Sequence, residues 1–241
     1  MAIAGTSQST QPTPSIQSTA IITPASNMTK DAAMARIRQC GVVAIMRHTE
    51  ASLAVEAAEA LLRGGVDIVE VTLNTAGASQ MIAQLTKHFG DRMLIGAGTV
   101  LNPAAVNQAL DAGARFVVAP NTNPTIIALC NRHGIPVFPG AFTPTEVVTA
   151  WDAGADAVKV FPVSGVGPRY IRDLRGPLPD IPLVPTGGIT SQNCVDYIKA
   201  GAVAVGAGSD LVDKGVVDRH EFAELERRAH AFCEGVKAGR A

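Results

Sequence analysis

Two charged residues interrupt otherwise apolar segments, and their types suit chemistry on a carbonyl group. Lys159 is flanked by two valines, and so is Glu70. Removing such charges from water costs several kcal/mol each, so a purely structural ion pair is the less favoured interpretation. Burial favours the neutral amine of a lysine, which can attack a ketone and form an iminium. A nearby carboxylate can shuttle the protons of these steps. The pair therefore predicts Schiff-base chemistry.

Two glycine-containing segments near the end of the chain predict an anion site. Thr186-Gly-Gly188 and Gly206-Ala-Gly-Ser209 each follow a β-rich run and precede an expected helix. Small residues let backbone N–H groups approach an anion closely, although a single glycine pair is more often only a turn. Because both segments occur together, we expect Gly187, Gly188, Gly208 and Ser209 to bind a phosphate group on the substrate.

Eight short β-rich runs provide the elements that would position these residues, and Ala- and Leu-rich helical segments separate them. The runs are Val42–Met46, Asp67–Leu73, Met93–Ala97, Arg115–Ala119, Ile135–Phe138, Asp156–Phe161, Pro182–Thr186 and Ala202–Gly206. Eight parallel strands that alternate with helices can form an open sheet or a closed barrel, and the strand count favours closure. The chain length of 241 residues fits one such domain. We therefore predict an α/β protein, a single-domain (β/α)8 TIM barrel over residues 29–241.

Strand alternation predicts which side chains face the barrel axis. In the second run, Val69 and Val71 face the helices, so Glu70 and Asn74 face the axis. In the sixth run, the flanking valines face the helices and Lys159 faces the axis. Active sites of such barrels lie at the carboxyl ends of the strands.

The first and third runs complete the predicted cluster. Arg47 continues the face of the first run that points to the axis, and Thr99 continues the face that holds Ile95 and Ala97. Four strands therefore bring polar groups to one mouth. His48 follows Arg47 there, but a lone loop histidine is more often simply solvated, so it is not included in the predicted site.

Composition excludes several other classes of function. The 20 basic and 21 acidic residues nearly cancel, which gives no electrostatic basis for binding nucleic acid. The four cysteines and five histidines are scattered without metal-ligand spacing, so we expect no metal, and reduced thiols suit a cytoplasmic protein. The Gly96-Ala-Gly98 segment lacks the rest of a dinucleotide fingerprint, and we expect no cofactor.

The amino-terminal segment differs in composition from the rest of the chain. Residues 1–28 are rich in Ser, Thr, Gln, Pro and Ala, and their apolar residues show no period, so we expect a disordered tail. The segment does not have the pattern of a signal or transit peptide. No apolar run is long enough to span a bilayer, and we predict no membrane association.

Taken in order, five motifs resemble those of the KDPG/KHG aldolase family, from about residue 32 to the end. These motifs are Glu70-Val-Thr-Leu-Asn74, Gly96-Ala-Gly-Thr99, Pro139-Gly140, Val158-Lys159-Val-Phe161-Pro162 and Thr186-Gly-Gly188. The resemblance implies a metal-independent pyruvate aldolase, usually a homotrimer, acting on a phosphorylated keto-deoxy sugar acid. Carried over by position, it implies Lys159 as the Schiff-base lysine and Glu70 as the general acid/base. It also implies Arg47 and Thr99 as contacts to the keto-acid carboxylate.

One position distinguishes two branches of this family. The 6-phosphogluconate members usually carry Arg where this chain has Asn74, whereas the galactonate branch has Leu-Asn there. Further segments resemble the galactonate branch: Pro120-Asn121, Gly167-Pro168-x-Tyr170-Ile171 and Gly208-Ser209-Asp210-Leu211. The two substrates differ at C4, so Asn74 is a candidate contact to that hydroxyl. The resemblance therefore favours the galactonate substrate and leaves the gluconate epimer as the alternative.

Two further interpretations remain open from the residues alone. A phosphosugar epimerase on the same barrel would keep the phosphate loops, but it gives Lys159 no covalent role. A non-catalytic phosphosugar-binding protein is also compatible with the fold. Release of pyruvate would distinguish the aldolase from both.

Overall fold

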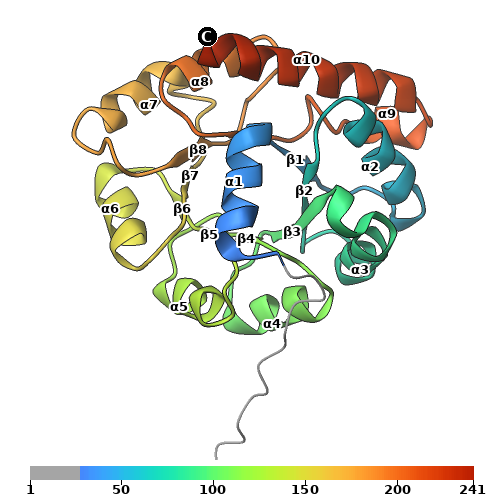
Figure 1. The fold of residues 1–241 in the computed structure, drawn as a ribbon, viewed down its shortest axis with the longest axis horizontal. Coiled ribbons are helices and arrows are strands. Elements are labelled where there is room, and N and C mark those ends of the chain that lie inside the picture. Colours follow the sequence, from blue (N-terminus) through green and yellow to red (C-terminus); the bar gives the residue numbers. More distant parts are fainter. Residues whose placement is uncertain (1–27) are drawn as a thin grey trace, which may run out of the picture.

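A computed structural model describes residues 28–241, so all of the expected tail except Met28 lies outside the described residues. Short strands alternate with helices along this part of the chain (Figure 1). The strands are β1 (Val42–Met46), β2 (Ile68–Thr72), β3 (Leu94–Gly98), β4 (Val117–Val118), β5 (Val137–Phe138), β6 (Gly140–Ala141), β7 (Val158–Val160), β8 (Leu183–Pro185) and β9 (Val205–Ala207).

The helices cover the outside of the strands, except for the first (Figure 1). The α-helices are α1 (Lys30–Cys40), α2 (Ala54–Arg63), α3 (Ala78–Phe89), α4 (Pro103–Asp111), α5 (Pro124–Arg132), α6 (Pro144–Asp152), α7 (Gly167–Arg175), α8 (Cys194–Lys199), α9 (Lys214–Asp218) and α10 (Phe222–Arg240). Two short 3₁₀ helices, η1 (Ala51–Leu53) and η2 (Gly90–Arg92), complete the set. No helix within residues 28–241 is long and apolar enough to cross a bilayer.

Several helices begin at polar caps that the sequence encodes. Asn102 accepts a hydrogen bond from the N–H of Ala105, and Pro103 occupies the first turn of α4. Thr143 and Glu146 form a reciprocal capping box at the start of α6. These contacts satisfy N–H groups that have no partner within the helix.

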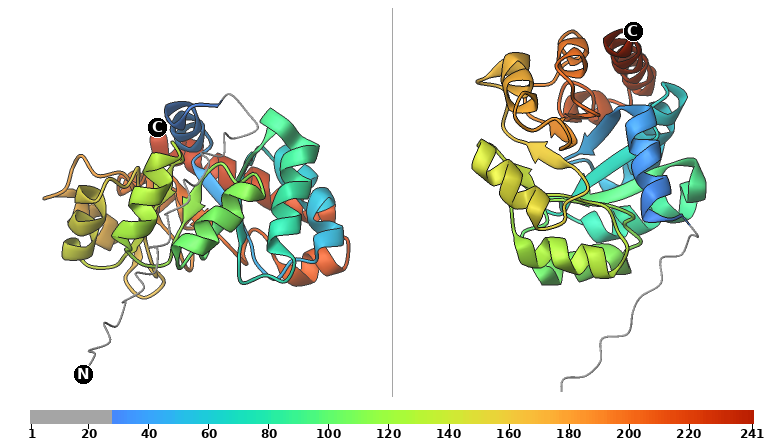
Figure 2. Two further views of the ribbon diagram at one scale, coloured as in Figure 1. Left: turned by 90° about the horizontal axis from the view of Figure 1, so that it is seen from below. Right: turned by 60° about the vertical axis from the view of Figure 1, so that its left-hand side comes forward.

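All strand pairs in the described part of the chain are parallel, and they form one curled α/β arrangement. One ladder has the order β5-β4-β3-β2-β1-β9, and a second has the order β6-β7-β8. The chain joins the two ladders at Pro139, between β5 and β6, and a parallel bridge pairs Thr186 with Gly206 on the opposite side. Figure 2 shows the strands curving with helices outside them.

The predicted β-rich runs each contain a strand, but a further short strand, β6, follows the fifth run and was not predicted. β5 pairs with β4, whereas β6 pairs with β7. Pro139 lies between them and has no N–H to donate, which interrupts the ladder at this point. The first run is confirmed as Val42–Met46, whereas the other strands begin one to three residues later than predicted, and β3 and β9 also end one residue later.

Two hydrophobic cores lie on the two faces of the curled sheet. The outer core, between strands and helices, contains Val69, Val71, Val158 and Val160, as predicted. The inner core contains the side chains at the starts of the strands, among them Val43, Ile68, Leu94 and Phe116. Met34 and Ile37 of α1 pack into this inner core, and Figure 1 shows α1 lying across the middle of the strands.

The predicted face of the third run is wrong. Ile95 and Ala97 belong to the outer core, so Gly96 and Gly98 face inward. Thr99 does not continue the alternation, because it follows the strand with a left-handed φ of 57°.

Candidate active site

Lys159 and Glu70 face each other from β7 and β2, as the alternation predicts. The Lys159 Nζ lies 4.0 Å from the Glu70 Oε1, and the two side chains are only 6% and 3% exposed. Glu70 pairs in register with Ile45 on β1 and Gly96 on β3. The structure therefore places an amine and a carboxylate together in a nearly water-free interior.

The Glu70 carboxylate depends on a glycine on the neighbouring strand. A Cβ atom at Gly98 would lie 1.9 Å from the Glu70 Oε1. Within residues 28–241, this buried oxygen has no hydrogen-bond partner. A buried acceptor without a partner is uncommon in native structures and is often found at functional sites. The Oε1 is therefore free to exchange a proton with a bound molecule.

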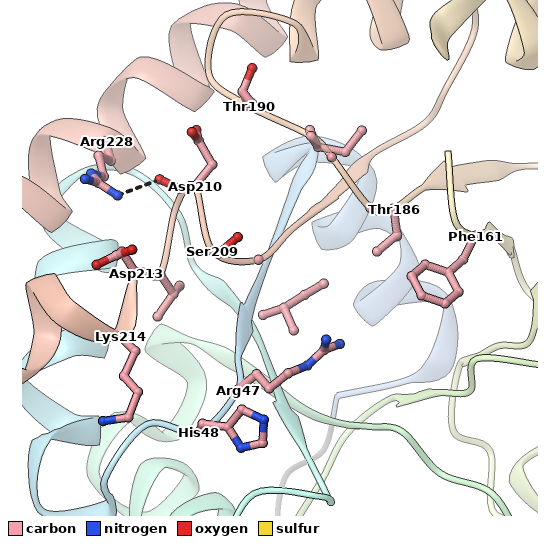
Figure 3. A pocket seen from close by; sticks show the side chains of 16 residues that line it. Arg47, His48, Phe161, Thr186, Thr190, Ser209, Asp210, Asp213, Lys214 and Arg228 are labelled. Atoms are coloured by element: carbon pink, nitrogen blue, oxygen red, sulfur yellow. Dashed lines mark hydrogen bonds between the residues drawn. The ribbon is translucent and has the colours of Figure 1, made fainter. Parts of the chain in front are cut away.

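Phe161 connects Lys159 to a cavity of about 650 Å³. Its ring centre lies 5.2 Å from the Lys159 Nζ, and the ring lines this cavity. The cavity opens at the carboxyl ends of β1, β8 and β9, where the loops after these strands meet (Figure 3). The reactive pair therefore lies next to a space large enough for a small ligand.

The cavity brings together five of the predicted binding residues. These are Arg47, Gly187, Gly188, Gly208 and Ser209. Gly187 and Gly188 have left-handed φ values of 96° and 74°, which only glycine adopts without strain. In the described chain, the N–H groups of Gly187, Gly188 and Ser209 donate to no protein acceptor. Such N–H groups can bind an anion.

Asp210 ties the two glycine-containing loops to each other and to the last helix. Its Oδ2 accepts a hydrogen bond of 3.0 Å from the N–H of Ser191, and its carbonyl oxygen accepts one of 3.0 Å from Arg228 (Figure 3). The helices α8 and α9 begin only at Cys194 and Lys214. The N–H groups at the cavity therefore come from the loops themselves, and not from the first helical turns that the sequence suggests.

Two predicted binding residues lie outside this cavity. Thr99 follows β3 and is partly exposed, and Asn74 is exposed in the turn after β2. Neither lines the space that Arg47 and the glycines share. The structure therefore places five predicted binding residues around the cavity, with Lys159 beside it next to Phe161, and it leaves these two outside.

Three threonines near the site were not among the predicted residues. Thr186 lines the cavity, and Thr72 and Thr75 are buried at and after the end of β2. Thr72 shares the inward face of Glu70, which is a signal that the sequence contains. His48, which is not among the predicted site residues, also lines the cavity. Among the described residues, no three His, Cys, Asp or Glu side chains are grouped so as to hold a metal ion.

Comparisons with known proteins agree on one family. The model of the family described as "KDPG and KHG aldolase" matches residues 33–228. The 2-dehydro-3-deoxy-6-phosphogalactonate aldolase of Escherichia coli is 38% identical over 200 residues, which cover 83% of this chain and 94% of that protein.

Two solved structures share the fold and part of the sequence. A native KDPGal structure has a TM-score of 0.77 and 36% identity, and the match covers 83% of this chain and 95% of that one. A KDPG aldolase from Legionella pneumophila, with pyruvate captured as a covalent carbinolamine, also has a TM-score of 0.77. It is 29% identical, and the match covers 84% of this chain and 97% of that one.

Proposed function

The chain belongs to the KDPG and KHG aldolase family, and we propose that it cleaves 2-dehydro-3-deoxy-6-phosphogalactonate to pyruvate and D-glyceraldehyde 3-phosphate. The observation that carries this proposal is the buried Lys159 amine, 4.0 Å from the Glu70 carboxylate. A lysine placed in this way can act as a covalent nucleophile, whereas an epimerase or a binding protein has no use for it.

The proposed reaction needs no group besides these side chains and water. The Lys159 Nζ attacks the C2 ketone, and the carbinolamine loses water to form an iminium. Glu70 accepts the proton of the C4 hydroxyl, the C3–C4 bond breaks, and the electron pair moves into the iminium to give an enamine. The aldehyde leaves. The enamine is then protonated at C3, and hydrolysis of the iminium releases pyruvate and the free lysine.

The binding roles follow from the shared cavity. The Arg47 guanidinium would pair with the substrate carboxylate, and the N–H groups of Gly187, Gly188, Gly208 and Ser209 would hold the phosphate. Thr99 as a second carboxylate contact and Asn74 as a contact to the C4 hydroxyl stay predictions, because both lie outside the cavity.

We also propose that the nine strands close into a (β/α)8 barrel, with β5 and β6 together as one strand. The chain link at Pro139 and the bridge between Thr186 and Gly206 support this closure, because they join the two ladders at both sides. The barrel would form one domain over residues 29–241.

A homotrimer and a cytoplasmic location complete the proposal. The apolar side chains of Phe142, Val148 and Trp151 are more than a third exposed, as at an interface between subunits.

All four cysteines are free thiols, which suits a reducing compartment such as the cytoplasm.

Trapping with borohydride tests the proposed chemistry. Incubation with pyruvate and sodium borohydride should add one reduced pyruvate to Lys159, because reduction makes the imine permanent. Lys159→Ala should abolish both the adduct and turnover, whereas the exposed control Lys87→Ala should change neither. Intact mass and peptide mapping measure the adduct. A folded wild-type protein without an adduct on Lys159 would contradict the proposal.

Turnover of the two C4 epimers tests the choice of substrate in the same preparations. A higher kcat/KM for the galactonate epimer supports the proposal, and a higher value for the gluconate epimer would establish the alternative. The Legionella relative with bound pyruvate is a KDPG aldolase, which makes the gluconate epimer the specific alternative.

A further inference from the structure

The loop that presents Arg47 has a strained backbone. Arg47 follows β1 directly, and the next residue, His48, has a left-handed φ of 57°. A residue with a side chain rarely adopts this conformation, which persists only where surrounding contacts enforce it. Both side chains line the cavity of the proposed active site (Figure 3). The contacts that hold this turn therefore also determine where the Arg47 guanidinium lies.

Thr75 holds one side of the turn. Its Oγ1 accepts a hydrogen bond of 3.0 Å from the His48 N–H, and the residue is 5% exposed. The backbone of Thr75 is itself fixed, because its N–H donates to the carbonyl oxygen of Thr72 over 2.9 Å. Its own carbonyl oxygen accepts from Ala78 at the start of α3. The hydroxyl is therefore an anchor with little freedom to move.

Thr72 holds the other side. Its Oγ1 lies 3.0 Å from that of Thr75, and it donates to the Met46 carbonyl oxygen over 3.4 Å. Since the Met46 carbonyl oxygen can only accept, the Thr72 proton points to Met46, and the Thr75 proton therefore points to Thr72. The chain of hydrogen bonds thus runs from the N–H after Arg47 to the carbonyl group before it, and it has one direction.

We propose that Thr72 and Thr75 are positioning residues for Arg47. Their two hydroxyls bind the peptide groups on both sides of Arg47 and aim its guanidinium at the carboxylate of the keto acid. This inference rests on the proposed function, because that function assigns the carboxylate to Arg47. The contact between Arg47 and the carboxylate forms when the keto acid binds. Loss of the Thr75 hydroxyl should therefore weaken binding of pyruvate, while Lys159 stays able to form the Schiff base.

The test measures the concentration of pyruvate that gives half-maximal borohydride trapping on Lys159. Thr75→Val removes the hydroxyl at nearly constant volume, and it should raise this concentration by about tenfold, the equivalent of one hydrogen bond. The maximal adduct should be unchanged. Thr75→Ser keeps the hydroxyl and should stay within about twofold of the wild type. Thr86→Val is the matched control, because the Thr86 hydroxyl also donates to a backbone carbonyl, that of Gly113, away from the cavity.

A double variant separates positioning from a general loss of stability. If Thr75 acts through Arg47, Thr75→Val should cause no further shift in an Arg47→Ala background. An additive shift, or an unchanged half-maximal concentration in Thr75→Val alone, overturns the inference. If Thr75→Val does not fold, Thr72→Val interrupts the same chain and must give the same shift. Absence of trapping in the wild type would instead refute the proposed function, so the two failures are distinguishable.

Discussion

At the scale of single residues, the Glu70 carboxylate occupies space that glycine at position 98 leaves open. A Cβ atom there would overlap the carboxylate, and a Cβ atom at Gly96 would lie 2.4 Å from the ring of Phe116. Two glycines on β3 thus leave room in the interior for two larger side chains, one from β2 and one from the residue before β4. The Glu70 carboxylate is the proposed acid/base group, and the absence of a side chain at Gly98 leaves the space that this carboxylate occupies.

Gly98→Ala should therefore displace the acid/base group. We expect kcat to fall by about a hundredfold or more, because general acid–base catalysis contributes roughly 10²- to 10⁴-fold. The extra methyl group should also lower the free energy of unfolding by about 1–3 kcal/mol. Steady-state kinetics and urea unfolding measure the two effects. Gly176→Ala is the control, because Gly176 has an ordinary helical φ of −55° and a Cβ atom there would lie 3.5 Å from its nearest neighbour, the Asp173 carbonyl oxygen. A Gly98→Ala enzyme with the kcat of the wild type would disprove this role.

Residue-scale prediction from the sequence succeeded where strand alternation applies. The inward faces of Lys159 and Glu70 follow from the valines beside them, which the outer core contains. Thr99 was misplaced because its left-handed backbone breaks the alternation after β3. Thr75 was not predicted, because a hydroxyl that accepts from a distant backbone N–H leaves no periodic pattern in the sequence.

At the scale of elements, α1 closes the end of the strands opposite the proposed active site. It precedes β1, and its buried residues Ala33, Met34 and Ile37 pack with the inward side chains at the starts of the strands. The Thr29 hydroxyl caps the helix by accepting from the N–H of Ala32. The salt bridge between Lys30 and Asp156 ties the helix to the segment before β7. This helix completes the inner core but does not reach the cavity.

Ile37→Ala should separate stability from catalysis. The side chain is 1% exposed, and its truncation leaves a cavity that should lower the free energy of unfolding by about 2–5 kcal/mol. The conservative Ile37→Val should cost only about 0.5–1.5 kcal/mol. Urea unfolding measures both values. The kcat/KM of the folded variants should equal that of the wild type, and a selective loss of activity would show that α1 influences the site.

The sequence predicted the number of β-rich runs better than their pairing. Periodicity and glycine-terminated helices locate each run to within a few residues. The sequence did not predict β6 or the change of pairing partner at Pro139, because the missing N–H marks an interruption without saying which neighbour the strand on each side joins. Register and closure depend on contacts between strands far apart in sequence.

At the scale of the whole molecule, all four thiols are free, and Cys40 and Cys233 line the same depression on the surface. Burial raises the pKa of Cys40 and Cys130 to about 12 and that of Cys233 to about 11, and it also raises the pKa of Cys194. Cys130 lies on α5 and is fully buried. At neutral pH these groups are therefore protonated in the folded protein, and none is a nucleophile that competes with the lysine.

Thiol reactivity should consequently depend on folding. At pH 8 the native protein should react slowly with a thiol reagent, and all four cysteines should react rapidly in urea. Because the folded pKa values lie above the unfolded value of about 9, the stability that protonated thiols contribute is complete below pH 9 and is lost as the pH rises toward 12. Thiol titration and urea midpoints between pH 8 and 10.5 measure these effects. Rapid labelling of Cys130 in the native state would contradict the expectation.

The contact of Arg228 with the Asp210 loop has a consequence for synthesis of the enzyme. Arg228 lies on α10, and the ribosome makes this helix after every strand and after both glycine-containing loops. In a nascent chain, Lys159 and Glu70 can already be in contact while the hydrogen bond from Arg228 to the loop that contains Gly208 and Ser209 is still missing. A polypeptide that ends before Arg228 would therefore contain the reactive amine but would lack the hydrogen bond that fixes the proposed phosphate-binding loop. Translation must proceed into α10 before the proposed phosphate site is complete.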